Sequence, residues 1–546
     1  MNLSEKIRKL TIELTEIPSI VGTREEINVV NAIYKRFTEM DYFKKNPDSI
    51  KMIDVVDDPL GRKSVMAVVR GRKGSSKKTV VLIGHTDTVG ISDYGKIKEY
   101  ATKPLELPSK LKEVQISDEA MEDLNSGEYL FGRGIFDMKC GTSTLMAIVE
   151  KFSNDVDELD GNIVFGAVCD EEGNSGGMLS LVPQLVNLKR DEGFEYQAVI
   201  DTDYMAPRYD GDENKYIYVG TVGKIMPSFY VVGSEAHGGD PFKGLDPNHI
   251  SSAIMEEIDF NTKYSDEAEG EYTVPPISLR QQDLKTEYSV QTARDSYLFF
   301  NFGTHSSTPD EMMKKVVKGA TEAFGKVIDN LNREYEKYCS FNNFKFEKLP
   351  WKPRVITYEE LLEKVRAEKG EELEALIKMR STELSEDESV DERAFALLMI
   401  KSVYDLWSDK DPVVIVYFSP PYYPHIYVKG ETDIEKKLLD AVNKVISETK
   451  SDYKIVMKKF YPYISDLSYA AAPREENAVA SLKNNMPGFG TKYNLPIEGM
   501  QELNLPVVNI GPFGKDAHKY TERLQEDYSF NVVPGMVLGT IAELLK

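Results

Sequence analysis

The chain has 546 residues, of which 41% are hydrophobic, and its formal net charge at pH 7 is −23. This length exceeds what one simple core requires, so we expect two domains or one large elaborated domain. Such an acidic surface repels phosphate backbones and anionic membranes, which excludes nucleic acid as an expected partner. The net charge says little about the substrate, because bound metal ions can reverse the local field.

The three cysteines, Cys140, Cys169 and Cys339, are spread widely along the chain. This odd, sparse count argues against a disulfide framework and is typical of a reducing compartment, and no pair has the spacing of a zinc knuckle. The opening segment MNLSEKIRKLTIELTEIPSI has the pattern of a charged amphipathic helix rather than a signal peptide. No run approaches the roughly 20 apolar residues that span a bilayer. We therefore predict a soluble, cytoplasmic protein without a membrane partner.

The first part of the chain alternates predicted helices and strands. Apolar residues fall at helical spacing from residue 3 to about 40, interrupted at Pro18-Ser19. Short apolar runs predict strands at Val65–Val69, Thr79–Ile83, Ile163–Val168 and Ala198–Ile200. Helices are predicted at Gly141–Phe152 and Ser175–Leu188, and residues 91–130 form a polar excursion. This alternation predicts an α/β layer with a largely parallel sheet.

The pattern changes near residue 213. Tyr216–Val219 and Ile225–Val232 alternate as half-buried antiparallel strands do. Three further predicted elements follow, a helix at Pro247–Phe260, a strand at Tyr297–Phe302 and a long helix at Pro309–Tyr338. This order predicts a small inserted α+β unit with one exposed sheet face. Residues 355–405, rich in Glu, Lys and Leu, are predicted to be helices on its outside.

The last part of the chain returns to the earlier pattern. The predicted elements are a strand at Val413–Phe418, a helix at Ile434–Thr449 and a strand at Val507–Ile510. We therefore predict a catalytic domain formed by residues 1–212 and 406–546, interrupted by an inserted domain at residues 213–405. No internal repeat or low-complexity tract is present.

A histidine lies at the end of one predicted buried strand. His85 follows the apolar run VVLIG, and the carboxyl ends of strands in an open α/β sheet are where ligands bind. Asp87, two residues later, can accept a hydrogen bond from the ring nitrogen that does not face a metal, which fixes the tautomer.

Acidic residues follow further predicted strands and turns. Asp137 lies in the glycine-containing turn FGRGIFDMKCG, where its short carboxylate can bridge two cations. VCDEEGNSGG contains the adjacent pair Glu171 and Glu172, which an extended segment separates into one ligand and one proton-handling base, although an acidic triplet also suits a helix N-cap. AVIDTDY offers Asp201 or Asp203 after the next strand.

A second histidine completes the candidate set near the end of the chain. His518 lies in the glycine-containing loop GPFGKDAHKYTERL. Two histidines and three carboxylates form a nitrogen and oxygen donor set that suits two Zn²⁺ ions, with Co²⁺ or Mn²⁺ as alternatives. Two such cations can share a hydroxide and polarise a carbonyl, and a neighbouring glutamate can move the proton.

Taken together, the motifs HTDTV, GRGIFDMK, DEEGNSGG, IDTD and GPFGKDAHKYTE resemble those of the M20 family of metallopeptidases and deacylases. The motifs occur in the family's order, so the resemblance spans most of the chain. It implies a zinc-peptidase-like α/β catalytic domain with a mostly parallel central sheet and an inserted α+β lid that mediates dimerisation. The segments YSVQTARDSYLFFNF and FYPYISDLSYA further resemble the arginine-utilisation (RocB-type) branch, which implies an association with amino-acid catabolism.

The resemblance also implies a role for each candidate residue. The implied metal ligands are His85 and Asp201 at one site and Glu172 and His518 at the other, with Asp137 bridging both. Glu171 is the implied base and Asp87 the partner of His85, while Asp203 competes with Asp201 for its position. Glu522 resembles the acidic residue that follows the family's final histidine.

His237, in GSEAHGGDPFKG, resembles the lid histidine that stabilises the developing oxyanion, often in the neighbouring subunit of a homodimer. The lid strand YLFFNFGTHSS lacks the arginine that many relatives use to grip a substrate carboxylate, and neither Arg280 nor Arg294 is in register to replace it. This departure argues against a standard C-terminal carboxypeptidase.

We therefore predict a metal-dependent hydrolase that cleaves an amide or peptide bond in a small acyl-amino acid or short peptide. A catalytically silent binding protein that retains the metals is the alternative. Retention of Glu171 beside Glu172 argues against that alternative, because a binder needs no base. A one-metal hydrolase and a phosphate-ester hydrolase are further alternatives, which metal stoichiometry and substrate assays would distinguish.

Overall fold

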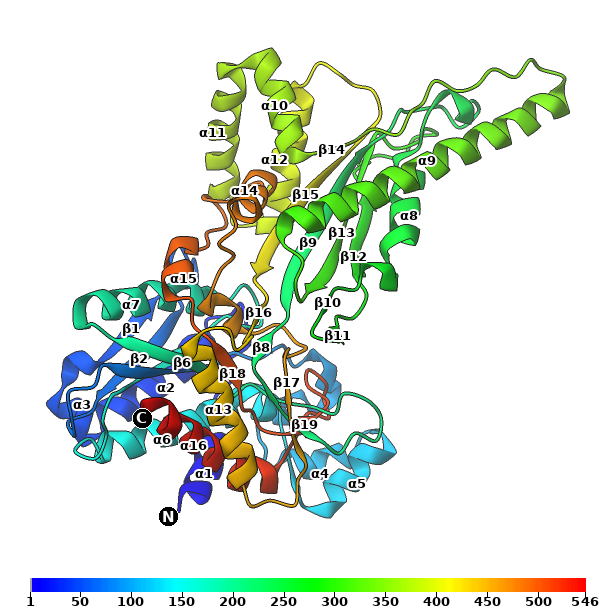
Figure 1. Ribbon diagram of the computed structural model, residues 1–546. Helices are drawn as coiled ribbons and strands as arrows, with labels where there is room; N and C mark the ends of the chain where they lie inside the picture. The colour runs from blue at the N-terminus through cyan, green and yellow to red at the C-terminus, as the bar shows by residue number, and fades with distance from the viewer. Residues whose placement is uncertain (1) are drawn as a thin grey trace. The chain divides into compact units, whose positions relative to one another are not determined.

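The structure is a computed structural model that describes residues 2–546, and the chain separates into two compact units (Figure 1). Unit 1 consists of Met1–Val222, Ile426–Ala472 and Pro496–Lys546, and unit 2 of Gly223–His425 and Pro473–Leu495. Compared with the ranges drawn from the sequence, residues 213–222 lie with unit 1 and residues 406–425 with unit 2. A second excursion of the chain, residues 473–495, also belongs to unit 2.

Unit 1 is built on an eight-stranded mixed sheet with the order β1-β2-β5-β3-β6-β18-β7-β17. Its strands are β1 (Ile50–Asp54), β2 (Lys63–Arg70), β3 (Lys78–His85), β5 (Asn162–Val168), β6 (Glu195–Asp201), β7 (Lys215–Tyr218), β17 (Ile455–Lys458) and β18 (Val507–Asn509). The central strands β5, β3, β6 and β18 are parallel, as predicted, whereas β1, β2 and β7 introduce antiparallel pairs. The assignment of Tyr216–Val219 to the inserted unit is wrong, because β7 pairs with β17 and β18 in this sheet.

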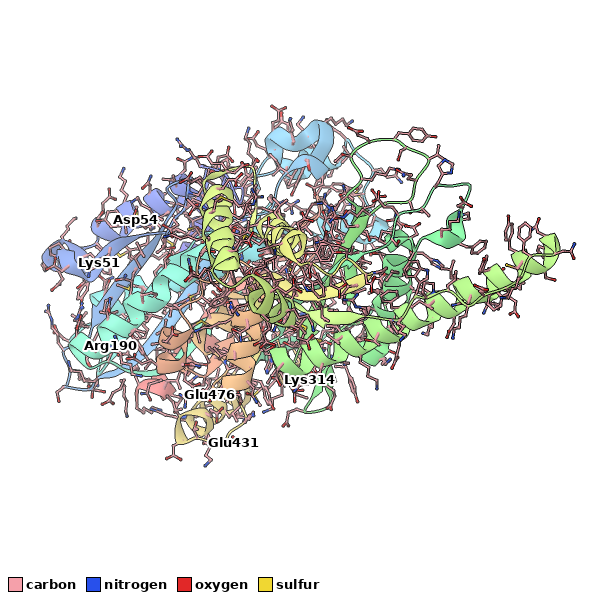
Figure 2. The ribbon with its side chains drawn as sticks, turned by 90° about the horizontal axis from the view of Figure 1, so that it is seen from above. Lys51, Asp54, Arg190, Lys314, Glu431 and Glu476 are labelled. Atoms are coloured by element: carbon pink, nitrogen blue, oxygen red, sulfur yellow. The ribbon has the colours of Figure 1, made fainter. Side chains whose placement is uncertain are left out.

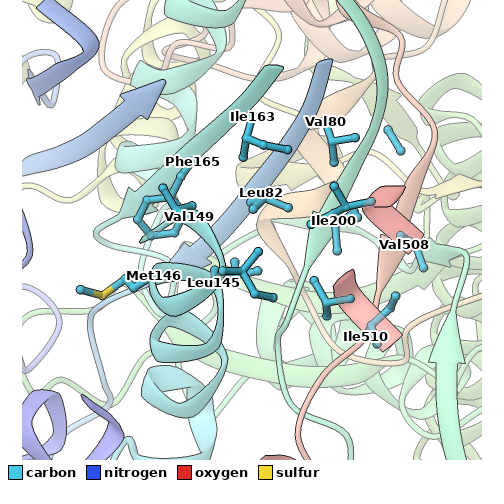
Figure 3. Close-up of a cluster of buried hydrophobic side chains, with 14 of the residues drawn as sticks. Val80, Leu82, Leu145, Met146, Val149, Ile163, Phe165, Ile200, Val508 and Ile510 are labelled. Carbon is cyan, nitrogen blue, oxygen red and sulfur yellow. The ribbon is translucent and has the colours of Figure 1, made fainter. Parts of the chain in front are cut away.

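Helices cover both faces of this sheet. The helices that contact its strands are α2 (Glu26–Thr38), α6 (Cys140–Asn154), α7 (Gly176–Glu192), α13 (Asp433–Glu448) and α16 (Val533–Leu545). The other helices of unit 1 are α1 (Leu3–Thr15), α3 (Asp41–Lys45), α4 (Leu107–Leu111), α5 (Asp118–Ser126) and α15 (Ile497–Leu503). The central strands contain continuous apolar runs, VVLIG in β3 and IVFGAV in β5, as burial on both faces requires. Alternate residues of β3 and β5, including Val80, Leu82 and Phe165, pack with Leu145 and Val149 of α6 in the main core (Figure 3).

The remaining elements of unit 1 are short. Two-residue or three-residue strands form small sheets, namely β4 (Tyr129–Phe131), β19 (Gly514–Lys515) and β20 (Arg523–Gln525) in one, and β8 (Gly220–Thr221) and β16 (Ile426–Tyr427) in the other. Short irregular helices are η1 (Pro47–Ser49), η2 (Ser92–Tyr100), η3 (Ile135–Lys139), η6 (Asp466–Ala470) and η7 (Tyr528–Val532). The predicted polar excursion at residues 91–130 therefore contains η2, α4, α5 and the start of β4.

Unit 2 contains a five-stranded sheet with the order β12-β13-β9-β15-β14. Its strands are β9 (Gly223–Val232), β12 (Ile277–Asp283), β13 (Asp295–Thr304), β14 (Val355–Thr357) and β15 (Val413–Tyr423), beside the small hairpin of β10 (Glu267–Ala268) and β11 (Glu271–Tyr272). The predicted strand Val413–Phe418 therefore lies in β15 of this unit and not in the catalytic domain, because it pairs with β9 and β14.

The helices of unit 2 are α8 (Pro247–Ile258), α9 (Pro309–Asn342), α10 (Tyr358–Lys369), α11 (Glu371–Glu386), α12 (Glu392–Leu406) and α14 (Glu476–Asn485), with the turns η4 (Pro241–Lys243) and η5 (Thr262–Tyr264). The prediction of one exposed sheet face is wrong for β9, β14 and β15. Helices α8 and α9 contact one face, while α10 and α12 bury Leu361, Ile400 and Val403 against Tyr230 and Ile415 of the sheet. The extra helices thus complete the core of this unit.

A buried carboxylate, that of Asp266, binds the turn that leads into α9. Asp266 accepts hydrogen bonds from three consecutive backbone N–H groups, those of His305, Ser306 and Ser307, at 2.7–2.8 Å. Burial opposes ionisation, but the N–H groups outweigh it and lower the pKa of Asp266 to about 2. The carboxylate therefore fixes the turn that leads into α9.

The C-terminal stretch Tyr528–Leu545 is, at 18 residues, long and apolar enough to cross a membrane, and 56% of it is buried inside the protein. Val533, Val537, Ile541 and Leu544 belong to the main core, and α16 contacts α13, β3 and β6. A helix buried in the core of a protein has the same composition.

Charged side chains such as Lys51, Asp54 and Arg190 lie on the outside of unit 1 (Figure 2).

Candidate metal centre

The candidate residues of unit 1 gather at the carboxyl edge of its parallel strands. His85 is the last residue of β3 and Asp201 the last residue of β6. Asp170, Glu171 and Glu172 follow β5, which pairs with β3. Neighbouring parallel strands end at the same edge of a sheet. These residues therefore lie close together in the fold although they are far apart in the sequence.

Asp137 lies between the two histidines. Its Oδ1 is 3.1 Å from Nε2 of His85, and its Oδ2 is 3.0 Å from Nε2 of His518. Gly134, with φ of 75°, begins the turn that carries Asp137, and an added Cβ there would lie 2.3 Å from the side chain of Thr88. One carboxylate therefore presents one oxygen to each imidazole.

Glu172 joins this pair of contacts. Its Oε1 is 3.0 Å from Nε2 of His518. One ligand atom from each of His85, Asp137 and Glu172 lies within 4.8 Å of the others, a spacing that a metal ion can fill. Glu171 lies on the other side, with Oε2 4.0 Å from Nε2 of His85. The structure therefore brings His85, Asp137, Glu171, Glu172 and His518 into one cluster.

Asp87 holds the glutamates by their backbone. Its Oδ1 accepts a hydrogen bond from N of Glu171 at 3.1 Å and its Oδ2 from N of Glu172 at 3.0 Å. Nδ1 of His85 lies 3.1 Å from the backbone oxygen of Asp87 and 3.6 Å from its carboxylate. A proton on Nδ1 suits both neighbours and leaves the lone pair of Nε2 directed at the cluster.

Asp201 and Asp203 are both buried, at 3% and 4% exposure. Asp201 accepts hydrogen bonds from N of Thr202 at 2.7 Å and from Oγ of Ser465 at 3.1 Å, and Asp203 from N of Tyr204 at 2.7 Å. Burial raises the pKa of Asp201 to about 6, and burial with the charge of Asp137 raises that of Asp203 well above its usual range. Both carboxylates therefore lie buried beside the cluster, where the pKa of each is raised.

The centre is strongly acidic, and His518 carries compensating charge. Burial opposes protonation of His518, but hydrogen bonds to Asp137 and Glu172 outweigh it and raise the pKa of His518 to about 11. Burial raises the pKa of Glu171 well above its ordinary value. So many buried carboxylates require positive charge beside them, and the mixed nitrogen and oxygen donors are those that Zn²⁺ binds. The residues present therefore fit a metal pair.

A buried arginine fixes the segment that carries the glutamates. Nη1 of Arg62 donates to Asp170 at 2.5 Å and to Glu26 at 3.1 Å, and its other nitrogens bind Asp58. Glu26 in turn accepts from N of Asp170 at 2.9 Å. Asp170 has φ of 66°, a left-handed conformation that these contacts hold in place.

A second buried ion pair supports Asp137. Nη1 of Arg133 donates to Oε2 of Glu522 at 2.8 Å, and both side chains are 1% exposed. Oε1 of Glu522 lies 3.4 Å from the backbone nitrogens of Phe136 and Asp137. Glu522, noted in the sequence only for following His518, thus ties the loop of His518 to the turn of Asp137.

Sequence reasoning missed several residues of the centre. Ser465 binds Asp201, and the neighbouring Asp466 is 3% exposed and lies beside Ser175. The ring of Tyr463 stacks on Tyr204 at 5.0 Å. The segment FYPYISDLSYA was informative only as a family resemblance, because nothing in its spacing indicates contact with β6.

His237 lies in unit 2, in the loop between β9 and η4. It is exposed, and its Nδ1 accepts a hydrogen bond from N of Gly239 at 3.0 Å. In the same unit Arg294 pairs with Asp405 at 2.7 Å and Arg280 donates to Gln282 at 2.8 Å. Arg294 is therefore already bound to a carboxylate.

This fold and this cluster define a hydrolase of the metallopeptidase class. The family model described as Peptidase family M20/M25/M40 matches residues 81–528. Protein RocB of Bacillus subtilis (strain 168) is 34% identical over 548 residues, covering 100% of this chain and 96% of that protein. The uncharacterized protein YqjN of the same organism is 32% identical over 547 residues, covering 99% and 97%.

Solved structures agree at the level of the fold. A tripeptidase from Staphylococcus aureus has a TM-score of 0.52 and 13% identity, covering 99% of this chain and 98% of that chain. The chain therefore belongs to peptidase family M20/M25/M40, and it is similar over its full length to RocB. The predicted family, fold class and enzyme class are confirmed.

Proposed function

We propose that unit 1 carries a two-metal hydrolase centre that cleaves an amide or peptide bond in a small acyl-amino acid or a short peptide. The observation that supports it best is the position of Asp137, with one carboxylate oxygen toward His85 and the other toward His518. A carboxylate so placed suits two cations, one on each side. Membership of a peptidase family supports the amide bond as the target.

The proposed ligands of the two metals are His85, Asp137, Glu172 and His518, with Asp201 as the fifth and Asp203 as its competitor. We propose Zn²⁺, with Co²⁺ or Mn²⁺ as alternatives, because the donors are imidazole nitrogens and carboxylate oxygens. When bound, such a pair supplies a Lewis acid for the carbonyl and an acidified water.

Glu171 is the proposed general base. It is 9% exposed, it borders His85, and its backbone N–H is fixed by Asp87. A carboxylate held in this way can take a proton from the attacking water and return it to the leaving nitrogen. Asp87 has a positioning role, since it holds both glutamates and the tautomer of His85.

The substitution Glu171→Gln tests the mechanism. It keeps the shape of the side chain but removes its basicity, so turnover of N-acyl amino acids and dipeptides should fall by about 10²–10⁴-fold. Metal analysis by mass spectrometry should still find two ions per chain. Glu431→Gln, an exposed position of unit 1, is the matched control and should retain full activity. Full turnover by Glu171→Gln with both metals bound would refute this role.

His237 is proposed to stabilise the developing oxyanion, as part of a homodimer formed through unit 2. The edge strand β12 supports an interface there, because Ile277 and Leu279 are 38% and 47% exposed on it. Mixing inactive Glu171→Gln and His237→Ala chains should restore part of the turnover if His237 acts on the partner's centre. No restoration would place its action within one chain.

We further propose a cytoplasmic enzyme of amino-acid catabolism, with arginine metabolism as the leading context. The sparse cysteines, all buried, support the compartment, and the resemblance to the arginine-utilisation branch supports the context. A metabolite screen of the metal-loaded enzyme, read by mass change, would identify the substrate. Complete inactivity on such a screen with two metals bound would favour the silent binding protein instead.

A further inference from the structure

Unit 1 contains a second concave site, a cavity of about 1130 Å³. Its walls come from the loop after β6, from the start of β7, from residues 452–454 and from the loop around His518, where Asp516 and Lys519 take part. His85, Asp137, Glu171 and Glu172 are not among its lining residues. The cavity is therefore separate from the metal centre.

A buried lysine lines this cavity. Lys215 is 4% exposed, and its Nζ lies 3.3 Å from the ring centroid of Phe513, with Tyr453 at 5.3 Å and Tyr528 at 5.9 Å. Within residues 2–546 its ammonium has aromatic faces around it but neither a hydrogen-bond acceptor nor a carboxylate within ion-pair distance. Burial lowers the pKa of Lys215 to about 8.

The nearest acidic residue does not neutralise this lysine. The carboxylate of Asp212 accepts hydrogen bonds from N of Arg208 at 3.0 Å, from Asn214 and from the hydroxyl of Tyr216 at 2.8 Å. An ammonium has three donors, and burying them without an acceptor is costly even when aromatic faces offset part of the cost. The floor of the cavity thus offers three unused charged donors.

Exposed side chains of both signs line the rim of the cavity, the basic ones being Arg208, Lys454 and Lys519. Asp210, Glu213 and Asp452 line it, are exposed, and make neither a hydrogen bond through their side chains nor an ion pair in the described part of the chain. Free carboxylates at the rim attract a cation, while the buried ammonium of Lys215 attracts an anion. The two charges lie in one cavity and suit a ligand that carries both.

We propose that this cavity is a ligand site for a small zwitterion of the amino-acid class. The ligand's carboxylate accepts hydrogen bonds from Nζ of Lys215, and its ammonium group faces the free carboxylates of Asp210, Glu213 and Asp452. A charge-assisted bond to a buried ammonium is strong, because the surrounding apolar rings exclude water. The aromatic rings of Phe513 and Tyr453 add apolar surface for the ligand's carbon atoms.

Calorimetric titration of the zinc-loaded full chain tests this site, with glycine, acetate and methylamine as the probes. We expect glycine to bind more tightly than acetate, and methylamine more weakly than either. Lys215→Met keeps the volume and removes the charge, so it should weaken glycine and acetate binding at this site at least tenfold. Lys454→Met, an exposed lining position, should leave both unchanged. Glycine bound at the metal centre would persist in both variants.

Equal glycine affinity in Lys215→Met and Lys454→Met would overturn the proposal, and Lys215 would then be a structural residue held by its aromatic neighbours. If Lys215→Met fails to fold, the triple variant Asp210→Asn, Glu213→Gln, Asp452→Asn decides. All three positions are exposed, and neutralising them should remove the preference for glycine over acetate. An unchanged preference for glycine over acetate in that variant would likewise overturn the proposal.

Discussion

Replacing Asp87 with asparagine should weaken metal binding without touching any proposed ligand. The carboxylate is fully buried, and each of its oxygens accepts one backbone N–H, from Glu171 and from Glu172. Asparagine has one oxygen only, so its NH₂ group must face one of these donors. One charge-assisted bond is lost and the other becomes neutral.

The magnitude follows from these two bonds. A hydrogen bond to a charged group contributes about 1.5–3 kcal/mol, so the change should cost ~2–4 kcal/mol in the position of the two glutamates and of His85. Losing such a supporting contact typically costs about 10–100-fold in metal affinity. Competition for Zn²⁺ with a coloured chelator measures this directly and needs no substrate.

Asp54→Asn is the matched control, because Asp54 is an aspartate of unit 1 whose side chain is 77% exposed. Its Zn²⁺ affinity should equal that of the wild type. Urea unfolding of the metal-free proteins separates the local effect from a general loss of stability. If Asp87→Asn binds Zn²⁺ as tightly as the control, the reasoning that Asp87 holds the centre together is refuted.

Three further predictions test other parts of the structure. Asp201→Asn and Asp203→Asn should separate the two candidates for the fifth ligand, since only the true ligand should lower the metal content from two ions toward one. Asp266→Asn should lower the free energy of unfolding in urea by about 1–2 kcal/mol, allowing for solvent screening. Because folding lowers the pKa of this carboxyl, the extra stability of the wild type should be complete above about pH 4 and vanish as the pH falls toward 2. Gly141→Ala should lower the melting temperature and metal content together, because its Cβ would lie 2.0 Å from the backbone oxygen of Thr202, whereas Gly535→Ala, with open space around it, should be neutral or stabilising by up to about 1 kcal/mol.

The strand-end residues were predictable from the sequence because a buried parallel strand has a recognisable continuous apolar run. VVLIG predicted β3 and located His85 at its end, and the run before Cys169 did the same for the acidic residues after β5. The carboxyl-edge rule then predicted that these side chains meet. For these residues, the apolar run of each strand was enough to predict the edge of the sheet at which they lie.

The neighbours of each strand and helix were not predictable in the same way. Tyr216–Tyr218 and β15 have strand patterns, yet nothing in a strand's own residues says which sheet it joins. The helices at residues 355–405 were predicted to lie on the outside, and nothing in their pattern indicated that α10 and α12 pack on β9 and β15. The bond from Arg62 to Asp170 joins residues 108 positions apart and leaves no local signal.

The position of β18 has a consequence for the order of synthesis. This strand, from the last part of the chain, pairs with β6 on one side and β7 on the other, and His518 follows it. While the chain is being made, β6 pairs with β3 on one side only, and the other side of Val199 and Ile200 remains an unpaired edge. His518 is the last of the proposed ligands to be synthesised, so the complete proposed metal site can form only after residue 518 has emerged.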